Sequence, residues 1–294
     1  MIGALGTTLC FALTAVFANR AAQQLGSTAA NLYRLVLAAL VLGVWAHTAG
    51  LGLGGGAFAW FFVSGIAGFG LGGVAMFQAL PRLGSSLAML IVQCGTVLVA
   101  AAVEWLWLGT KLTPAQIAFA LLTLVGVVLG LLPRSLPLAP REELRTGIWW
   151  AIVSAFGQGV GAVLSRKAFA VAAIAHLQPD PATTAYQRVL GGLVVAGFAV
   201  WLARTVHPEK QRASLGTAWP WVLANALTGP VLGVTCYQWA LSTTPAGIVQ
   251  PIVATSPLVT ILLAAWFEHT WPRPLYHLGA ALAVAGVAGL YLTR

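Results

Sequence analysis

The sequence predicts an all-α membrane protein, and the distribution of its charged residues is the main reason. The 294 residues include 15 Lys or Arg and 6 Asp or Glu, so 7% of the chain is charged. Soluble domains carry about 25%. The charges are separated by long uncharged runs, of which 213–267 is the longest. A helix crossing a bilayer needs about 20 apolar residues, and these runs lack the alternating pattern of membrane β-barrel strands.

The uncharged runs divide into ten predicted membrane-spanning helices. Their ranges are 2–19, 29–47, 57–79, 84–105, 114–132, 147–168, 183–203, 217–240, 245–267 and 274–292. Charged side chains are costly at the bilayer centre and therefore mark the ends of spans. Glu104 and Glu268 close the fourth and ninth spans, while Pro114 and Pro274 open the fifth and tenth.

Glycine and proline within the spans predict close helix packing and bent helices. Three Gly-x-x-x-Gly pairs, at 68 and 72, 126 and 130, and 157 and 161, each place two small residues on one helical face, which allows backbones to approach. Pro230, Pro251 and Pro257 lie inside the eighth and ninth spans. Proline removes a helical hydrogen bond, so we expect these spans to bend, either as static curvature or as a gate.

The two halves of the chain resemble each other, which indicates a duplication. Four matches recur in the same order: Ala79-Leu80 with Ala240-Leu241, Pro114 with Pro274, Gly126 with Gly286, and Tyr33-Arg34 with Tyr186-Gln187-Arg188. Five spans per half is an odd number, so the second half would enter the membrane in the opposite sense. Inverted repeats around a central site are typical of secondary transporters. We therefore predict two inverted five-helix repeats around a central cavity, at 1–133 and 146–294, joined by a connector at 134–145. Chance similarity between Ala/Gly/Leu-rich helices is the alternative.

Uncharged polar and aromatic side chains within the spans predict a substrate site. An amide in hydrocarbon needs a hydrogen-bond partner and therefore faces inward. The predicted site residues are Gln78, Gln93, Gln158, Tyr237, Gln238, Trp239 and Gln250. We expect Tyr237 and Trp239 to stack on a ligand ring. Because neighbouring residues point in different directions on a helix, we do not expect Tyr237 and Gln238 to face one ligand together. The alternative is that the amides only tie helices together.

Several chemistries have no residues to support them. No Asp or Glu lies deep in a predicted span, so we expect no proton coupling through a membrane-embedded carboxylate. The sequence has no phosphate-binding loop, metal-ligand cluster or Ser/His/Asp grouping, which predicts a protein that is not an enzyme and uses no cofactor or metal. We attribute the net charge of +9 to membrane loops rather than to nucleic-acid binding, and expect Arg34 and Arg188 to extend toward the interface.

Two motifs resemble those of the drug/metabolite transporter superfamily, EamA type. The stretch 108–116, Leu-Gly-Thr-Lys-Leu-Thr-Pro-Ala-Gln, is similar to the family's Leu-Gly-Glu-x-Leu-Thr-Pro-x-Gln, with Thr110 in place of the usual Glu. Ala79-Leu80 followed by Ser85-Ser86 resembles the family's Ala-Leu-x-x-x-x-Ala-Ser. The resemblance covers the whole chain and is greatest to bacterial exporters of aromatic amino acids.

The resemblance implies a monomeric exporter of aromatic amino acids in the bacterial inner membrane, working by alternating access. A multidrug or nucleotide-type exporter and a lipid scramblase remain alternatives. The membrane orientation is open as well. More Lys and Arg residues follow odd-numbered spans than even-numbered ones, which would place both termini outside, whereas the resemblance implies cytoplasmic termini.

Overall fold

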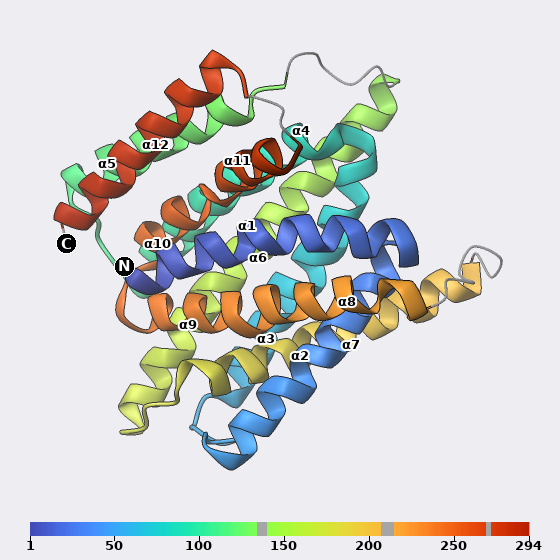
Figure 1. Ribbon diagram of the computed structural model, residues 1–294. Coiled ribbons are helices and arrows are strands. Elements are labelled where there is room, and N and C mark those ends of the chain that lie inside the picture. The colour runs from blue at the N-terminus through green and yellow to red at the C-terminus, as the bar shows by residue number, and fades with distance from the viewer. Residues whose placement is uncertain (134–139, 207–214, 269–271, 294) are drawn as a thin grey trace.

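The computed structural model describes residues 1–133, 140–206, 215–268 and 272–293, which form a bundle of helices without a strand (Figure 1). The segments are α1 (Ile2–Leu25), α2 (Ser27–Thr48), α3 (Phe58–Gly65), η1 (Ile66–Leu71), α4 (Gly72–Val103), η2 (Glu104–Leu108), α5 (Pro114–Leu131), α6 (Arg141–Ile174), α7 (Pro181–Val206), α8 (Leu215–Ala226), η4 (Leu227–Gly233), α9 (Val234–Thr243), α10 (Ala246–Val253), α11 (Ser256–Glu268) and α12 (Pro274–Leu292). The η segments are π-helical.

Eight helical stretches within the described residues are long and apolar enough to cross a membrane. Seven of them cover one predicted span each. The eighth, Phe58–Leu108, covers the predicted spans 57–79 and 84–105, and its backbone bends at Gly84, where φ is 72°. The remaining predicted span, 217–240, corresponds to α8, η4 and α9, which are not among the eight.

The predicted connector is partly helical, so the sixth helix begins earlier than the predicted span 147–168. Its residues 134–139 lie outside the described residues, but α6 already begins at Arg141 rather than at 147. Glu142 and Glu143 lie in the first turn of α6, where carboxylates interact favourably with the helix dipole. The charged residues that predicted a loop therefore form the exposed beginning of a long helix.

The stretch 108–116 forms the turn between η2 and α5. Gly109 adopts a left-handed conformation, with φ of 69°, and ends the preceding helix. Thr113 and Gln116 then form a capping box, in which each side chain hydrogen-bonds the other's backbone, and Pro114 occupies the first turn of α5. The Gln116 amide also donates to the Thr293 carbonyl at 3.1 Å, so this turn holds the C-terminal end of α12.

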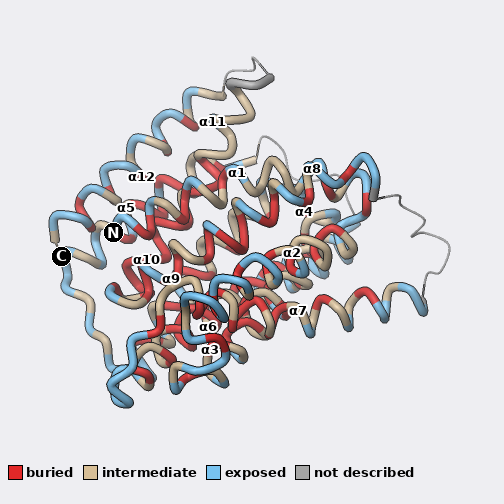
Figure 2. The backbone as a smooth tube through the Cα atoms, turned by 60° about the horizontal axis from the view of Figure 1, so that its bottom comes forward, coloured by how far each residue is buried: buried red, intermediate tan, exposed pale blue. Residues whose placement is uncertain are grey.

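Burial and exposure fit a bundle surrounded by lipid. Buried residues follow the inward faces of the helices in Figure 2, while large apolar side chains such as Leu98, Phe198 and Val284 are exposed on the outside. A protein in water rarely exposes so much apolar surface. Met1 and Leu290 belong to one buried cluster, so both termini lie at the same end of the bundle. We call this the terminal end, and the end with Gly84 the opposite end.

Glycines bring pairs of helices into backbone contact, as the Gly-x-x-x-Gly pairs predicted. α5 and α12 lie side by side (Figure 1), and a Cβ on Gly126 would lie 2.4 Å from the Ala283 nitrogen. A Cβ on Gly161 would lie 3.0 Å from the Gly68 backbone, which explains the close contact of α6 with η1. Such contacts matter because lipid supplies no hydrophobic drive for helix association.

Replacing Gly126 by alanine is expected to destabilise the protein. The added methyl group would collide with the backbone of α12, and overpacking of this kind costs roughly 1–3 kcal/mol. Gly197→Ala is the matched control, because a Cβ there meets nothing within 4 Å. Thermal unfolding in detergent measures both. An equal melting temperature for the two variants would show that α5 and α12 do not pack so closely.

Asp180 fixes the start of α7 next to the α2–α3 loop. Its carboxylate accepts hydrogen bonds from the backbone N–H groups of Ala182 and Thr183, from the Thr183 hydroxyl, and from the Trp45 indole. Burial acts to raise the pKa of this carboxyl, but the hydrogen bonds from Thr183, Trp45 and Ala182 outweigh burial and lower it.

This lowered pKa predicts an acid-dependent loss of stability. A carboxylate whose pKa is depressed by folding stabilises the protein above its unfolded value of about 3.9, and the contribution disappears as the pH falls through the folded value. Asp180→Asn should therefore lose less stability than the parent between pH 5 and pH 3. Melting temperatures across that range test this, and parallel curves for the two proteins would contradict it.

Candidate substrate-binding site

A polar cluster lies in the interior where α7 meets α9 and η1. It consists of Arg188, Tyr237, Gln238 and Gln250, and we call it the interior polar cluster. All four residues are buried: Arg188 is 5% exposed, Tyr237 6%, Gln238 0% and Gln250 5%. The Gln250 amide donates to the Tyr237 hydroxyl, and the Arg188 guanidinium donates to the Gln238 side-chain oxygen at 3.3 Å.

Aromatic rings surround the guanidinium of Arg188. Its Cζ atom lies 5.2 Å from the centre of the Tyr237 ring and 5.4 Å from that of Phe69, both within cation–π range. Phe11 of α1 continues the aromatic wall, with its ring centre 6.4 Å from that of Tyr237. The cluster can therefore offer a ligand hydrogen-bond donors, a positive charge and ring faces.

Gln93 and Gln158, two other predicted site residues, are half-buried on neighbouring helices. Gln93 of α4 donates to the hydroxyl of Ser256 in α11 at 3.3 Å, and Gln158 of α6 donates to the hydroxyl of Ser154 one turn earlier at 3.1 Å. A Cβ on Gly72 would lie 2.9 Å from Cγ of Gln158, so this side chain packs against the start of α4. Both amides use only part of their hydrogen-bonding capacity in these contacts.

A buried ion pair closes the terminal end. The Glu104 carboxylate, 1% exposed, accepts from Arg166 Nε at 3.2 Å and from the Gly247 backbone N–H at 3.0 Å. Arg166 also donates to the Leu241 carbonyl at 2.7 Å. These contacts join the start of η2, the body of α6, the last turn of α9 and the first turn of α10.

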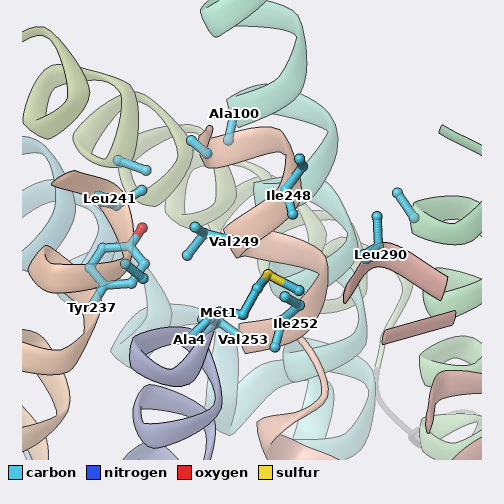
Figure 3. Close-up of a cluster of buried hydrophobic side chains, with 14 of the residues drawn as sticks. Met1, Ala4, Ala100, Tyr237, Leu241, Ile248, Val249, Ile252, Val253 and Leu290 are labelled. Atoms are coloured by element: carbon cyan, nitrogen blue, oxygen red, sulfur yellow. The ribbon is translucent and has the colours of Figure 1, made fainter. Parts of the chain in front are cut away.

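Apolar packing seals the same end (Figure 3). Met1 lies against Ile252, and the cluster extends from Tyr237 on one side to Leu290 on the other. The opposite end contains a surface cavity of about 580 Å³, lined by Gln78, Pro81, Arg82, Glu142, Glu143 and Thr146. The described residues of the terminal end are thus closely packed, while the opposite end has an open polar hollow on the surface between α4 and the start of α6.

Comparison with known proteins identifies the family. The model of the EamA-like transporter family matches residues 1–132 and 145–292, which is most of the chain. The chain belongs to the EamA-like transporter family. It is therefore a multi-pass membrane protein and a transporter of small metabolites, in a family of transporters rather than enzymes.

A solved structure supports the fold of this EamA-like transporter but does not narrow its substrate. That structure, described only as a "Crystal structure of protein", superposes with a TM-score of 0.79 at 20% identity, covering 100% of this chain and 99% of the other. A search of curated proteins finds no match.

Two of the predicted site residues lie away from the interior polar cluster of the transporter. Gln78 is exposed near the opposite end, where its side-chain oxygen and its carbonyl accept hydrogen bonds from Arg82. Trp239 is 48% exposed on the outer face of α9. Tyr237 and Gln238, by contrast, both contact Arg188, although they are neighbours on one helix.

The charged residues of the site were missed from sequence. Arg188 was expected at the interface but points into the cluster, and Arg34 donates to Asn31 at 2.9 Å while approaching Gly229 of η4. Glu104 does lie near the end of a span, yet it is buried rather than exposed. The matching positions of Arg34 and Arg188 in the two halves were the sequence signal that could have revealed them.

The bends expected from proline are present, with a π-helical segment at Pro230 and a break after α10.

Proposed function

We propose that this EamA-like transporter exports aromatic amino acids, and related small amphipathic metabolites, across the bacterial inner membrane by alternating access. In this proposal residues 1–133 and 146–294 are inverted five-helix repeats around a central cavity. The stretches matched by the family model, 1–132 and 145–292, agree with that division. The resemblance of the whole chain to the bacterial aromatic amino acid exporter YddG supports the substrate class.

The interior polar cluster is the observation that carries the proposal. Its amides and its hydroxyl can pair with the amino and carboxyl groups of an amino acid, while Tyr237 and Phe69 offer faces for the ring. We assign Tyr237, Gln238 and Gln250 to the site, and we include the half-buried Gln93 of α4 and Gln158 of α6 in the same proposed cavity. We leave out Gln78 and Trp239, because their side chains are exposed away from this cluster.

The difference between the two ends supports alternating access. The terminal end is closed by the Glu104–Arg166 pair and by the cluster around Met1, whereas the opposite end has an open surface hollow between α4 and α6. An alternating-access carrier closes one end at a time around a site near the middle. We therefore propose that in this conformation the site opens toward the opposite end. We also propose that the Glu104–Arg166 ion pair breaks when the terminal end opens.

Liposomes containing the pure protein test the proposal. Labelled phenylalanine, tyrosine or tryptophan should equilibrate across these liposomes faster than across protein-free ones, because a carrier lets a substrate move down its gradient. The Gln238→Leu variant serves as a folded control with a damaged site. If none of the three amino acids enters faster than into empty liposomes, aromatic amino acids are not the substrates.

A further inference from the structure

Two arginines, one buried and one half-buried, occupy corresponding places in the two halves. Arg34 is seven residues beyond Ser27, the first residue of α2, and Arg188 is seven residues beyond Pro181, the first residue of α7. Each guanidinium approaches a glycine in a π-helical segment of the other half. A Cβ on Gly68 of η1 would lie 2.6 Å from Arg188 Nη2, and a Cβ on Gly229 of η4 would lie 3.6 Å from Arg34 Nη1.

Arg188 and its neighbour have donors without acceptors. Arg188 Nε and Gln238 Nε2 are both buried and make no hydrogen bond, although the two side chains contact each other through Nη1 and Oε1. A buried donor without a partner costs free energy, so two such donors side by side indicate that something binds there. The other buried side-chain atoms without a partner in the described residues are Gln187 Oε1 and Thr235 Oγ1. Two adjacent free donors call for an acceptor, and an oxyanion supplies more than one.

Among the described residues, no carboxylate forms an ion pair with either arginine. The ion pairs among the described residues are Glu104–Arg166 and the exposed Glu142–Arg145. Arginine keeps its proton in proteins, so Arg188 stays charged in a buried site. Its neighbours among the described residues are the rings of Phe69 and Tyr237, the Tyr237 hydroxyl and the Gln238 amide oxygen, all of them uncharged. Arg34 likewise has an amide oxygen, that of Asn31, as its hydrogen-bond partner.

We infer that Arg34 and Arg188 form a pair of carboxylate-binding sites, one in each half of the transporter, that hold the carboxylate of the substrate. The inference rests on the proposed function and specifies the chemistry of the same site. A single guanidinium in uncharged surroundings balances a single negative charge, and its planar fork matches the two oxygens of a carboxylate. In this conformation Arg188 is enclosed beside the closed terminal end and Arg34 is half-buried, so we expect opening of the terminal end to expose Arg188.

Calorimetric binding to the purified protein tests this inference with two ligands that differ in one group. Phenylalanine carries a carboxylate and phenylalaninamide does not. The parent protein should bind phenylalanine about tenfold or more tightly than the amide, since charge-assisted hydrogen bonds of this kind are worth at least that ratio. In Arg188→Gln and in Arg34→Gln the preference should shrink markedly. In Arg20→Gln, which changes an exposed arginine of α1, it should persist.

Two further variants distinguish loss of the carboxylate preference from loss of folding. Arg188→Lys keeps the charge and should retain part of the preference. Gly68→Ala keeps the arginine but places a Cβ 2.6 Å from Nη2, so the guanidinium must shift and the preference should fall. A parent protein that binds both ligands equally, or a full preference in folded Arg188→Gln or Arg34→Gln, would overturn the pair of sites.

A third ligand separates this inference from the proposed function. 3-Phenylpropionate has the ring and the carboxylate but no amino group. If the parent protein binds it in an Arg188-dependent way while no aromatic amino acid is transported, the carboxylate sites stand and the proposed substrate is wrong. If aromatic amino acids are transported equally by the parent and by Arg188→Gln, the substrate stands and the carboxylate sites are wrong.

Discussion

Replacing Glu104 by leucine is expected to destabilise the transporter by about 3–5 kcal/mol, the usual cost of breaking a buried ion pair by removing one partner. The substitution leaves the Arg166 guanidinium and the Gly247 N–H without the carboxylate they share. Because these groups lie on α6 and α10, the closed terminal end should loosen first. Chemical unfolding in detergent measures the loss.

Two control variants separate the effect of this ion pair from a general effect of removing charge. Glu142→Leu breaks an ion pair whose side chains are 85% and 80% exposed, and should cost less than about 1 kcal/mol. The double variant Glu104→Leu/Arg166→Met removes both charges of the pair and should recover most of the lost stability, since an apolar replacement of a buried pair is often neutral. A Glu104→Leu protein as stable as Glu142→Leu would show that the pair does not hold the terminal end closed.

Truncating the interior polar cluster should weaken substrate binding about tenfold or more for each residue removed. A site that pairs polar groups of its substrate loses roughly 1–3 kcal/mol when one partner is lost, which is about tenfold or more in affinity. We expect Gln238→Leu and Gln250→Leu to raise the half-saturation concentration by that factor. Tyr237→Phe should raise it less, because the ring remains and only the hydroxyl that accepts from Gln250 is lost.

Exposed residues provide the controls for these measurements. Gln24→Leu changes an exposed amide of α1 and should transport like the parent. Gln78→Leu and Trp239→Leu should behave like this control, because both side chains point away from the cluster. Parent-like transport by all three cluster variants would mean that these amides only pack helices together and that the site lies elsewhere.

The spans could be predicted from sequence because a helix that crosses the bilayer must be a long, uncharged and mostly apolar segment. Uncharged runs long enough to cross the membrane correspond to the helices, apart from details such as the start of α6 at Arg141. The glycine pairs also predicted real backbone contacts, as between Gly126 and Ala283, since the absence of a side chain is what permits them.

The direction in which each side chain points could not be predicted in the same way. α9 follows the π-helical segment η4, and the wider turn of a π-helix changes the phase of every residue after it. This is one reason that helical periodicity did not place Tyr237 and Gln238 together and Trp239 outside. The inward position of Arg188 depends on Gly68, which lies in the other half of the chain. Contacts of that kind become visible only once the halves are packed together.

Uptake of labelled tryptophan, lysine and a nucleotide sugar by liposomes that contain the pure protein tests the central claim most directly. A carrier with an uncharged aromatic and amide site and one guanidinium should take up tryptophan well above the level of empty liposomes and leave the other two near that level. Lysine lacks the ring, and the nucleotide sugar carries more negative charge than a single guanidinium balances. Uptake of the nucleotide sugar without tryptophan, or no uptake of any of the three, would contradict the account.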